Sequence, residues 1–533
     1  MRKSVAIIIA LALGCATASA QGVNQTVRVE NNYVSELAGV QKLGVEMSVP
    51  DSLLHFDYNF DYSVFETPFK GAYEFTPYSI HVQPDASEYD GSSFWFKAGA
   101  GYTLHPVLQF VAAPVVKSDR MLSIYNNGSG YIGRSIGNAL STYGAADSFN
   151  GWDFSDRLGI EGRWLLSKVS LKGDVHYDVI GAGDNLVENN STTHALNAGV
   201  SVDPVIIKKF AWNATVKAGV LESFGPNMDP FGGYNASVAS TMGQAQGDVR
   251  ILADVLVAVD RLSVKEDGDM KVNLHPLFSV IPHTECEFAW GSLRAGLKLE
   301  YGRKFAVAPD LRVSTDVLGG SMKLFAGLDG GQSLTDYLTL RSNFHRALPM
   351  YCVNDISYER YHVYAGLDGH YGNGLQYGFK AGYRNFQNTA MECLYGWRFG
   401  AMNVVYADAN VTYKNERIDA DMNLHLAGSS SPDELEYFAL PTFSADAGFT
   451  YNWNKRIYAG LWCEGRTVRK GTVNGTVADL PAYVNLGLDA EARVSNKLGF
   501  WLEAGNLLCQ EIWRNPVCAE KGPYFTVGIC LKF

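Results

Sequence analysis

The last ten residues, Tyr524-Phe525-Thr526-Val527-Gly528-Ile529-Cys530-Leu531-Lys532-Phe533, indicate the fold class of this chain. A β-strand points successive side chains to opposite faces, so this segment has one apolar face and one narrow, mostly polar face. A soluble sheet would rarely leave five apolar side chains on a terminal strand, whereas an outer-membrane β-barrel needs them against lipid. We therefore predict that the segment is the barrel-closing strand, with the apolar face made by Phe525, Val527, Ile529, Leu531 and Phe533.

Composition agrees with a barrel and disfavours several other classes. The chain has 533 residues, of which 12% are aromatic, and it contains 54 glycines, which suit tight turns and crowded walls. The mean hydropathy of −0.07 is typical of barrels, since lipid-facing and lumen-facing residues average out. A net charge of −11 argues against a nucleic-acid partner. Eight scattered cysteines form neither a disulfide framework nor a CxxC zinc pattern.

The N-terminus has the pattern of a secretory signal peptide. Arg2 and Lys3 precede a short apolar run, and Ala18-Ser19-Ala20 is a small-x-small cleavage site. We predict a signal peptide over residues 1–20, with a lipoprotein cysteine at Cys15 as the alternative. No later run of 18 apolar residues occurs, so a membrane role would require a barrel.

Residues 21–90 differ in pattern from the rest of the chain. Four prolines (Pro50, Pro68, Pro77 and Pro84) interrupt this stretch, and proline interrupts central strands. We expect a periplasmic or lumen-filling leader here, and a poorly ordered tail is the alternative.

Alternating runs separated by turn clusters fill residues 91–533. The clearest hairpin runs from 405–413 through a turn at 414–416 into 418–426. Alternation alone would also fit a soluble sandwich. Strand lengths near ten, short turns on one side and longer loops on the other favour an all-β, transmembrane antiparallel barrel of about 16–22 strands.

Two sets of polar residues are the candidate lumen-facing side chains. A charge at the bilayer midplane costs about 2–4 kcal/mol on the lipid face, so such residues must point inward. Clustered oxygens could instead bind a divalent cation, and paired carboxylates could do acid–base work. We favour a hydrated, salt-bridged wall, with no metal, cofactor or catalytic residue. The two sets are Asp419, Asp421, Asn423 and His425, and Asp489, Glu491 and Arg493.

Several short motifs resemble a Bacteroidota family of outer-membrane barrels that is TonB-dependent-receptor-like. They are a presumed turn at 308–314, the Ala-Gly-Leu-Asp-Gly repeats at 326–330 and 365–369, Ala439-Leu440-Pro441, and Gly505-Asn506-Leu507-Leu508 before the closing strand. In each repeat, glycine is interpreted as admitting a neighbouring backbone at a tight place. The chain departs from the family in that about seventy residues precede Phe94, about half of what a full plug domain needs, which puts plug-gated transport in doubt.

The resemblance implies a transporter or pore of unknown cargo in the bacterial cell outer membrane. The alternative is a non-conducting accessory subunit of an outer-membrane assembly or export complex. We do not expect an enzyme, because neither Gly-x-Ser-x-Gly nor His-Glu-x-x-His occurs. The expected partners are outer-membrane lipids and other outer-membrane or periplasmic proteins, with no nucleic acid.

Overall fold

The computed structural model describes residues 93–533, apart from 103, 118, 137–147, 185–189, 206–209, 226–227, 267–268, 346, 348–350, 373, 433–435, 474, 515 and 517–521. The signal peptide predicted for 1–20 and the leader predicted for 21–90 lie outside the described residues. No helix in the described part of the chain is long and apolar enough to cross a membrane.

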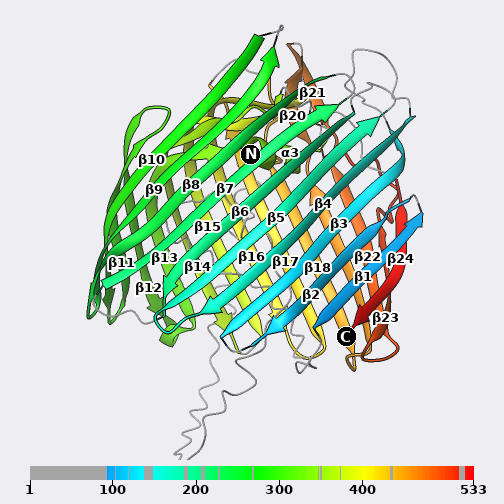
Figure 1. The fold of residues 1–533 in the computed structure, drawn as a ribbon, viewed down its shortest axis with the longest axis horizontal. Coiled ribbons are helices and arrows are strands. Elements are labelled where there is room, and N and C mark those ends of the chain that lie inside the picture. The colour runs from blue at the N-terminus through cyan, green and yellow to red at the C-terminus, as the bar shows by residue number, and fades with distance from the viewer. Residues whose placement is uncertain are drawn as a thin grey trace, which may run out of the picture. The chain divides into compact units, whose positions relative to one another are not determined.

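Twenty-two strands form one antiparallel sheet that closes into a barrel (Figure 1). This number is at the upper end of the 16–22 that the sequence predicts. A separate two-stranded hairpin, β20–β21, lies in one connection, and the named helical segments of the described residues are the short η2 (Leu318–Gly320) and α3 (Tyr337–Asn343). The strands are β1 Phe94–Tyr102, β2 Val107–Val116, β3 Arg120–Ile136, β4 Ser148–Leu165, β5 Val169–Asp184, β6 Ser191–Pro204, β7 Phe210–Gly225, β8 Met228–Gln246, β9 Val249–Glu266, β10 Asp269–Phe288, β11 Gly291–Tyr301, β12 Phe305–Val317, β13 Met322–Thr335, β14 Asp355–Tyr371, β15 Leu375–Cys393, β16 Gly396–Lys414, β17 Ile418–Ser430, β18 Phe443–Trp453, β19 Ile457–Arg466, β20 Arg469–Val473, β21 Thr476–Leu480, β22 Tyr483–Arg493, β23 Leu498–Gly505 and β24 Tyr524–Lys532.

The last strand closes the ring by pairing with β23 on one side and β1 on the other. The backbone N–H groups of Ser93 and Phe94 both donate to the carbonyl oxygen of Phe533, at 2.6 and 2.9 Å. An even number of antiparallel strands leaves the start of β1 and the end of β24 at one rim. Connections at that rim are short, the longest being 205–209, whereas 336–354, 467–482 and 506–523 lie at the other. The first rim is therefore periplasmic and the second extracellular.

The outer surface of the barrel is apolar. On β7 the side chains of Phe210, Trp212, Val216 and Val220 are 57, 36, 50 and 56% exposed, and polar or small residues alternate with them. Exposing this apolar surface to water would be unfavourable, whereas contact with lipid chains is favourable. The barrel therefore resides in the bacterial outer membrane.

Several strands exceed the predicted length of about ten residues. β9 has 18 residues and β10 has 20, and Figure 1 shows both extending far along the barrel. Backbone groups that bond to a neighbouring strand do not require a membrane around them, so the pairing of β9 with β10 continues beyond the apolar band as far as Glu266 opposite Asp269. Alternation cannot reveal this extension.

The predicted hairpin in the C-terminal third is confirmed, since β16 ends at Lys414 and β17 begins at Ile418. The motif at 308–314 is not a turn but lies within β12, where Pro309 is opposite Leu297. Proline removes only one potential ladder donor, and Pro309 stands where β12 pairs with β11 alone, because the pairing of β12 with β13 begins at Leu311. One proline was therefore too weak a signal to predict a turn.

Candidate binding site in the barrel lumen

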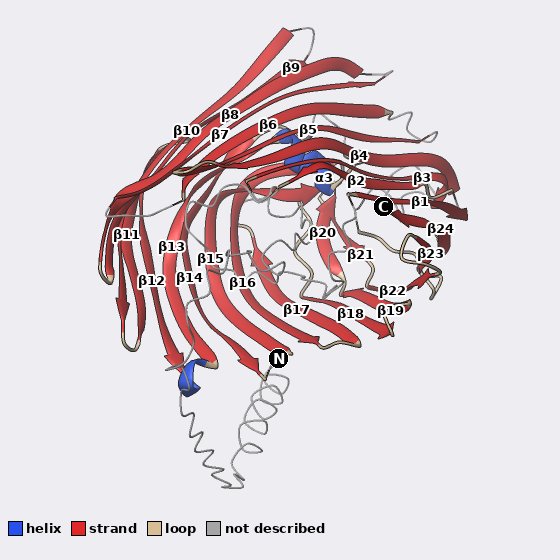
Figure 2. Cartoon of the chain, turned by 60° about the horizontal axis from the view of Figure 1, so that its bottom comes forward, coloured by secondary structure: helices blue, strands red, loops and turns tan. Residues whose placement is uncertain are grey.

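The connection between β13 and β14 folds into the barrel, and Figure 2 shows its helix α3 inside the ring of strands. Asp336 caps the helix by accepting a hydrogen bond from the backbone N–H of Thr339 at 3.0 Å. The hydroxyl of Tyr337, 1% exposed, lies 3.2 Å from both Thr193 Oγ1 on β6 and Ser223 Oγ on β7. These contacts hold the connection against the inner wall.

An apolar cluster reinforces the attachment of α3. It joins the helix and the residues after it to four neighbouring strands, and it buries all nine of its central side chains. Such burial is the main stabilising contribution available to a short helix, because seven residues are too few to be stable alone. The cluster consists of Ala195, Leu221, Phe231 and Leu262 from the wall, and Tyr337, Leu340, Phe344, Ala347 and Cys352 from the connection.

Arg341 is the most unusual member of this contact, because its side chain is 0% exposed. Its guanidinium donates to the hydroxyl of Ser191 at 2.5 Å and to the carbonyl oxygen of Ala347, while its Nε has no hydrogen-bond partner. No carboxylate forms an ion pair with it among the described residues. A buried cation balanced only by neutral oxygens is costly, so the attachment of α3 is weaker than its apolar contacts alone suggest.

Two ionisable groups in this contact are held neutral. Burial raises the pKa of the Tyr337 hydroxyl, and the nearby Arg341 partly opposes that shift. Burial likewise raises the pKa of the Cys352 thiol to about 12, again against Arg341. At neutral pH both groups are therefore uncharged parts of the packed cluster, and neither is a nucleophile.

A cavity of about 710 Å³ lies between α3 and the wall formed by β4–β9. Amide side chains line it together with charged ones, and its five aspartates outnumber Arg157 and Lys217. Arg157 Nε pairs with Asp178 at 2.5 Å, so one of these cations is already neutralised. The cavity carries excess negative charge, and apolar side chains share its lining with the polar ones. Its charged and imidazole lining residues are Asp156, Arg157, Asp174, His176, Asp178, Lys217, Asp260, Asp336 and His345.

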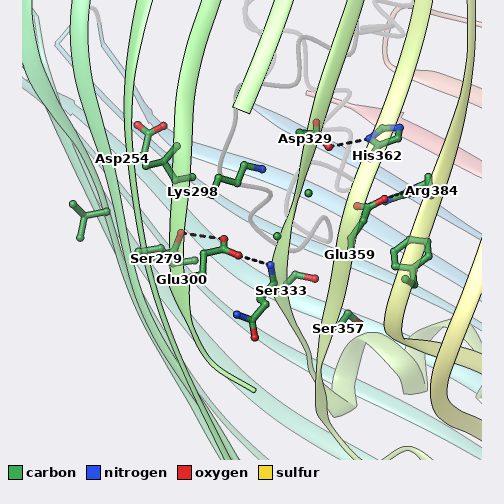
Figure 3. A pocket seen from close by; sticks show the side chains of 17 residues that line it. Asp254, Ser279, Lys298, Glu300, Asp329, Ser333, Ser357, Glu359, His362 and Arg384 are labelled. Carbon is green, nitrogen blue, oxygen red and sulfur yellow. Dashed lines mark hydrogen bonds and ion pairs between the residues drawn. The ribbon is translucent and has the colours of Figure 1, made fainter. Parts of the chain in front are cut away.

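Beside it, a smaller pocket holds the only group of three or more His, Cys, Asp or Glu side chains in the described part of the chain whose ligand atoms lie close enough to share an ion (Figure 3). Asp329, Glu359 and His362 each offer one ligand atom, and these atoms lie within 4.8 Å of one another. His362 Nδ1 is 3.0 Å from Asp329 Oδ1, and its Nε2 is 2.6 Å from the hydroxyl of Tyr406. Arg384 donates to the two oxygens of Glu359 at 2.6 and 3.0 Å.

Irregular strand pairing accompanies this pocket. The register between β13 and β14 shifts between Asp329 and Gly331, and that between β14 and β15 shifts around Glu359. Such bulges re-aim side chains, and they are common next to functional sites. Glu300 fills the space beside Gly331 (φ 137°), accepting from the backbone N–H of Gln332 at 2.6 Å.

The two Ala-Gly-Leu-Asp-Gly repeats lie opposite each other, with Ala326 paired to Ala365. A Cβ added to Gly327 would lie 2.4 Å from the ring of Tyr364, so an aromatic ring occupies this space. A Cβ on Gly330 would instead meet the carbonyl oxygen of Arg360 at 2.9 Å. The interpretation that glycine admits a neighbouring backbone therefore holds at Gly330 and is wrong at Gly327.

The predicted residues of β17 occupy separate contacts along the strand. Asp419 lies 3.8 Å from Lys414, and His425 pairs with Asp408. Asn423 and His425 line a further cavity of about 320 Å³. A Cβ added to Gly448 would lie 2.5 Å from Asp421 Oδ1.

The predicted residues of β22 form a second, distant group. Arg493 donates to Glu491 at 2.7 Å and to the hydroxyl of Tyr458 at 3.0 Å, and Asp489 packs over Gly460. Neither group joins the trio Asp329, Glu359 and His362. The lumen-facing orientation of all seven residues stays a prediction.

Sequence reasoning missed the trio. Asp329 belongs to the Ala-Gly-Leu-Asp-Gly repeat at 326–330, which suggested no ligand. The spacing of Glu359 and His362 in the sequence suggested none either. The trio forms only because β13 and β14 pair, which places Asp329 opposite His362.

No protein-family model matches the sequence, and no curated relative matches it. Solved structures do resemble the fold. A variant of the ferric enterobactin receptor PfeA from Pseudomonas aeruginosa superimposes with a TM-score of 0.62 and 10% identity, over 83% of this chain and 81% of that one. The siderophore receptor PirA from Acinetobacter baumannii gives 0.62 and 9%, over 83 and 80%. The FrpB iron transporter from Neisseria meningitidis gives 0.63 and 7%, over 83 and 81%. At such identities the likeness is one of fold.

Proposed function

We propose that this chain is an outer-membrane transporter, TonB-dependent-receptor-like, that binds and passes a small hydrophilic solute through its lumen. The cargo is unknown. One similar structure is named an iron transporter and another a siderophore receptor. We do not assign these cargos to this chain, because identities of 7 to 10% indicate a shared fold alone.

The observation that carries the proposal is the 710 Å³ cavity beneath α3. Sites for small molecules typically enclose about 300–1,000 Å³ and place a few polar groups to orient the ligand. Here Asn127, Asn197 and Asn235 offer amide donors and acceptors, beside the charged groups already described. These hydrogen-bonding and charged groups suit a hydrophilic solute that also has some apolar surface.

Flux through the purified full chain tests the proposal. In liposomes or planar bilayers, we expect ion conductance and uptake of small sugars or amino acids. Asn235→Trp places a bulky ring in the cavity and should lower flux severalfold. Val238→Trp is the matched control, because Val238 is 48% exposed on the outer face of the same strand and its variant should conduct normally.

A silent bilayer would contradict the transporter proposal. If the silent protein also co-purified with another outer-membrane assembly after mild detergent extraction, the accessory-subunit alternative would be favoured instead. A lone, conducting monomer would count against that alternative.

The finer family assignment is also a proposal. A Bacteroidota origin rests on the short sequence motifs alone. The role of residues 21–90 is tested by removing them, since a lumen plug predicts raised conductance, whereas a partner-binding arm predicts loss of a complex at unchanged current.

A further inference from the structure

We propose that Asp329, Glu359 and His362 bind one divalent transition-metal ion on the inner wall of the barrel. Two ligand atoms that each lie about 2.1 Å from one ion are about 3.0 Å apart at a right angle and about 3.4 Å apart at the tetrahedral angle. The observed distance between His362 Nδ1 and Asp329 Oδ1 is 3.0 Å. The ion would replace the proton that these two atoms share, with little movement of either side chain.

Glu359 can supply the third ligand while it keeps its ion pair. Arg384 uses one lone pair on each carboxylate oxygen. An ionised carboxylate has about four such acceptor positions, so each oxygen retains one for an ion. Together, the ionised side chains of Asp329, Glu359 and Arg384 carry one net negative charge. A divalent cation changes this to one net positive charge, so the charge of the loaded site stays small.

The hydroxyl of Tyr406 lets His362 change its protonation pattern. An ionised Asp329 can only accept, so without metal His362 Nδ1 carries the proton that bonds to it and Nε2 accepts from the tyrosine hydroxyl. With metal on Nδ1, the proton resides on Nε2 and is donated to the tyrosine oxygen. A hydroxyl can donate or accept, so Tyr406 orients the ring in both states, as outer-shell partners of metal-binding histidines do.

The pocket also accommodates the remaining ligands. Beside the three side chains lies a space of about 90 Å³, lined by charged and apolar side chains and large enough for several water molecules that would complete the coordination. One imidazole nitrogen with two carboxylates suits ions such as Zn²⁺ or Co²⁺. Ca²⁺ prefers six to eight oxygens, and Cu⁺ prefers sulfur, so neither matches this set.

The proposal stands independently of transport, because it concerns binding alone. The test uses the untagged full chain in detergent micelles, stripped with a chelator and titrated with Zn²⁺ by calorimetry and with Co²⁺ by visible absorption. We expect one saturable site. His362→Gln and Asp329→Asn should each weaken binding at least 100-fold, and Tyr406→Phe about 10- to 100-fold, since it removes only the outer-shell partner.

His425→Gln is the matched control, because His425 also pairs with an aspartate, Asp408, but lacks a third ligand. Its zinc affinity should equal that of the wild type. Folding of each variant is checked by heat-dependent migration in gels. X-ray absorption spectroscopy of the Zn²⁺-loaded wild type reports the ligands of the ion without relying on any variant. We expect one imidazole nitrogen, with oxygen atoms as the other ligands. Absence of a saturable site, or equal losses in His362→Gln and His425→Gln, would overturn the assignment.

Discussion

Replacing Tyr337 by alanine should release α3 from the inner wall of the barrel. The ring is 1% exposed and packs edge-on against Phe231 with centroids 5.0 Å apart. Its hydroxyl also contacts Thr193 and Ser223. Leu340 and Phe344 of the same connection add apolar contacts with the wall, whereas the buried Arg341 on the helix has no carboxylate partner among the described residues.

The size of the effect follows from these contacts. Truncating a buried aromatic side chain to alanine costs about 3–5 kcal/mol, which would shift the docked-to-released ratio about 100- to 4,000-fold. Tyr337→Phe keeps the ring and loses only the hydroxyl. Thr193 and Ser223 then still bond each other at 3.0 Å, so this variant should cost about 1 kcal/mol, roughly a fivefold shift.

Cys352 reports the release, because its thiol lies in the same cluster and is 0% exposed. With a pKa of about 12, only about one thiol in 10⁴ is ionised at pH 8, whereas roughly a quarter is ionised at an ordinary pKa near 8.5. Maleimide labelling of Cys352 should therefore be slow in the wild type, slightly faster in Tyr337→Phe and fast in Tyr337→Ala. Conductance should rise in the same order.

The Cys352→Ser variant measures the labelling of the other cysteines, of which Cys509 is exposed, and this labelling is subtracted from that of each protein. Equal labelling rates in Tyr337→Ala and the wild type would refute the reasoning. It would show that the contacts of Tyr337 do not hold α3 against the wall.

Three further predictions concern pH, lumen orientation and backbone strain. Because the docked state raises the pKa of the Cys352 thiol, docking is fully favoured below about pH 8.5 and weakens above it, about 30-fold by pH 10. Conductance should rise over that range, and a Cys352→Ser variant should rise much less. Asp421→Cys should react with a water-soluble charged thiol reagent, while Met422→Cys, whose native side chain is 40% exposed on the opposite face, should be shielded by lipid; the reverse order would place this strand the other way round. Gly331→Ala should lower the free energy of unfolding by about 1–3 kcal/mol, since its φ of 137° is strained for alanine and the added Cβ would lie 2.9 Å from Glu300 Oε2; an unchanged unfolding midpoint in urea would contradict this.

The sequence by itself determined the strands and the turns that join many of them. Alternating apolar residues, as in Phe525 to Phe533, require two different surroundings for the two faces of a strand. That information is local, because neighbouring residues on one strand carry it. It predicted a lipid-facing barrel, its approximate strand number and the hairpin between β16 and β17.

The tertiary structure alone decided what lies inside the ring. Tyr337 meets Thr193, a residue 144 positions earlier, and no local pattern foretells that the connection after β13 turns inward. Asp329 meets His362 only through the pairing of β13 with β14. Contacts between distant segments depend on the closed sheet that brings them together, so the cavity and the trio became visible only once the barrel was complete.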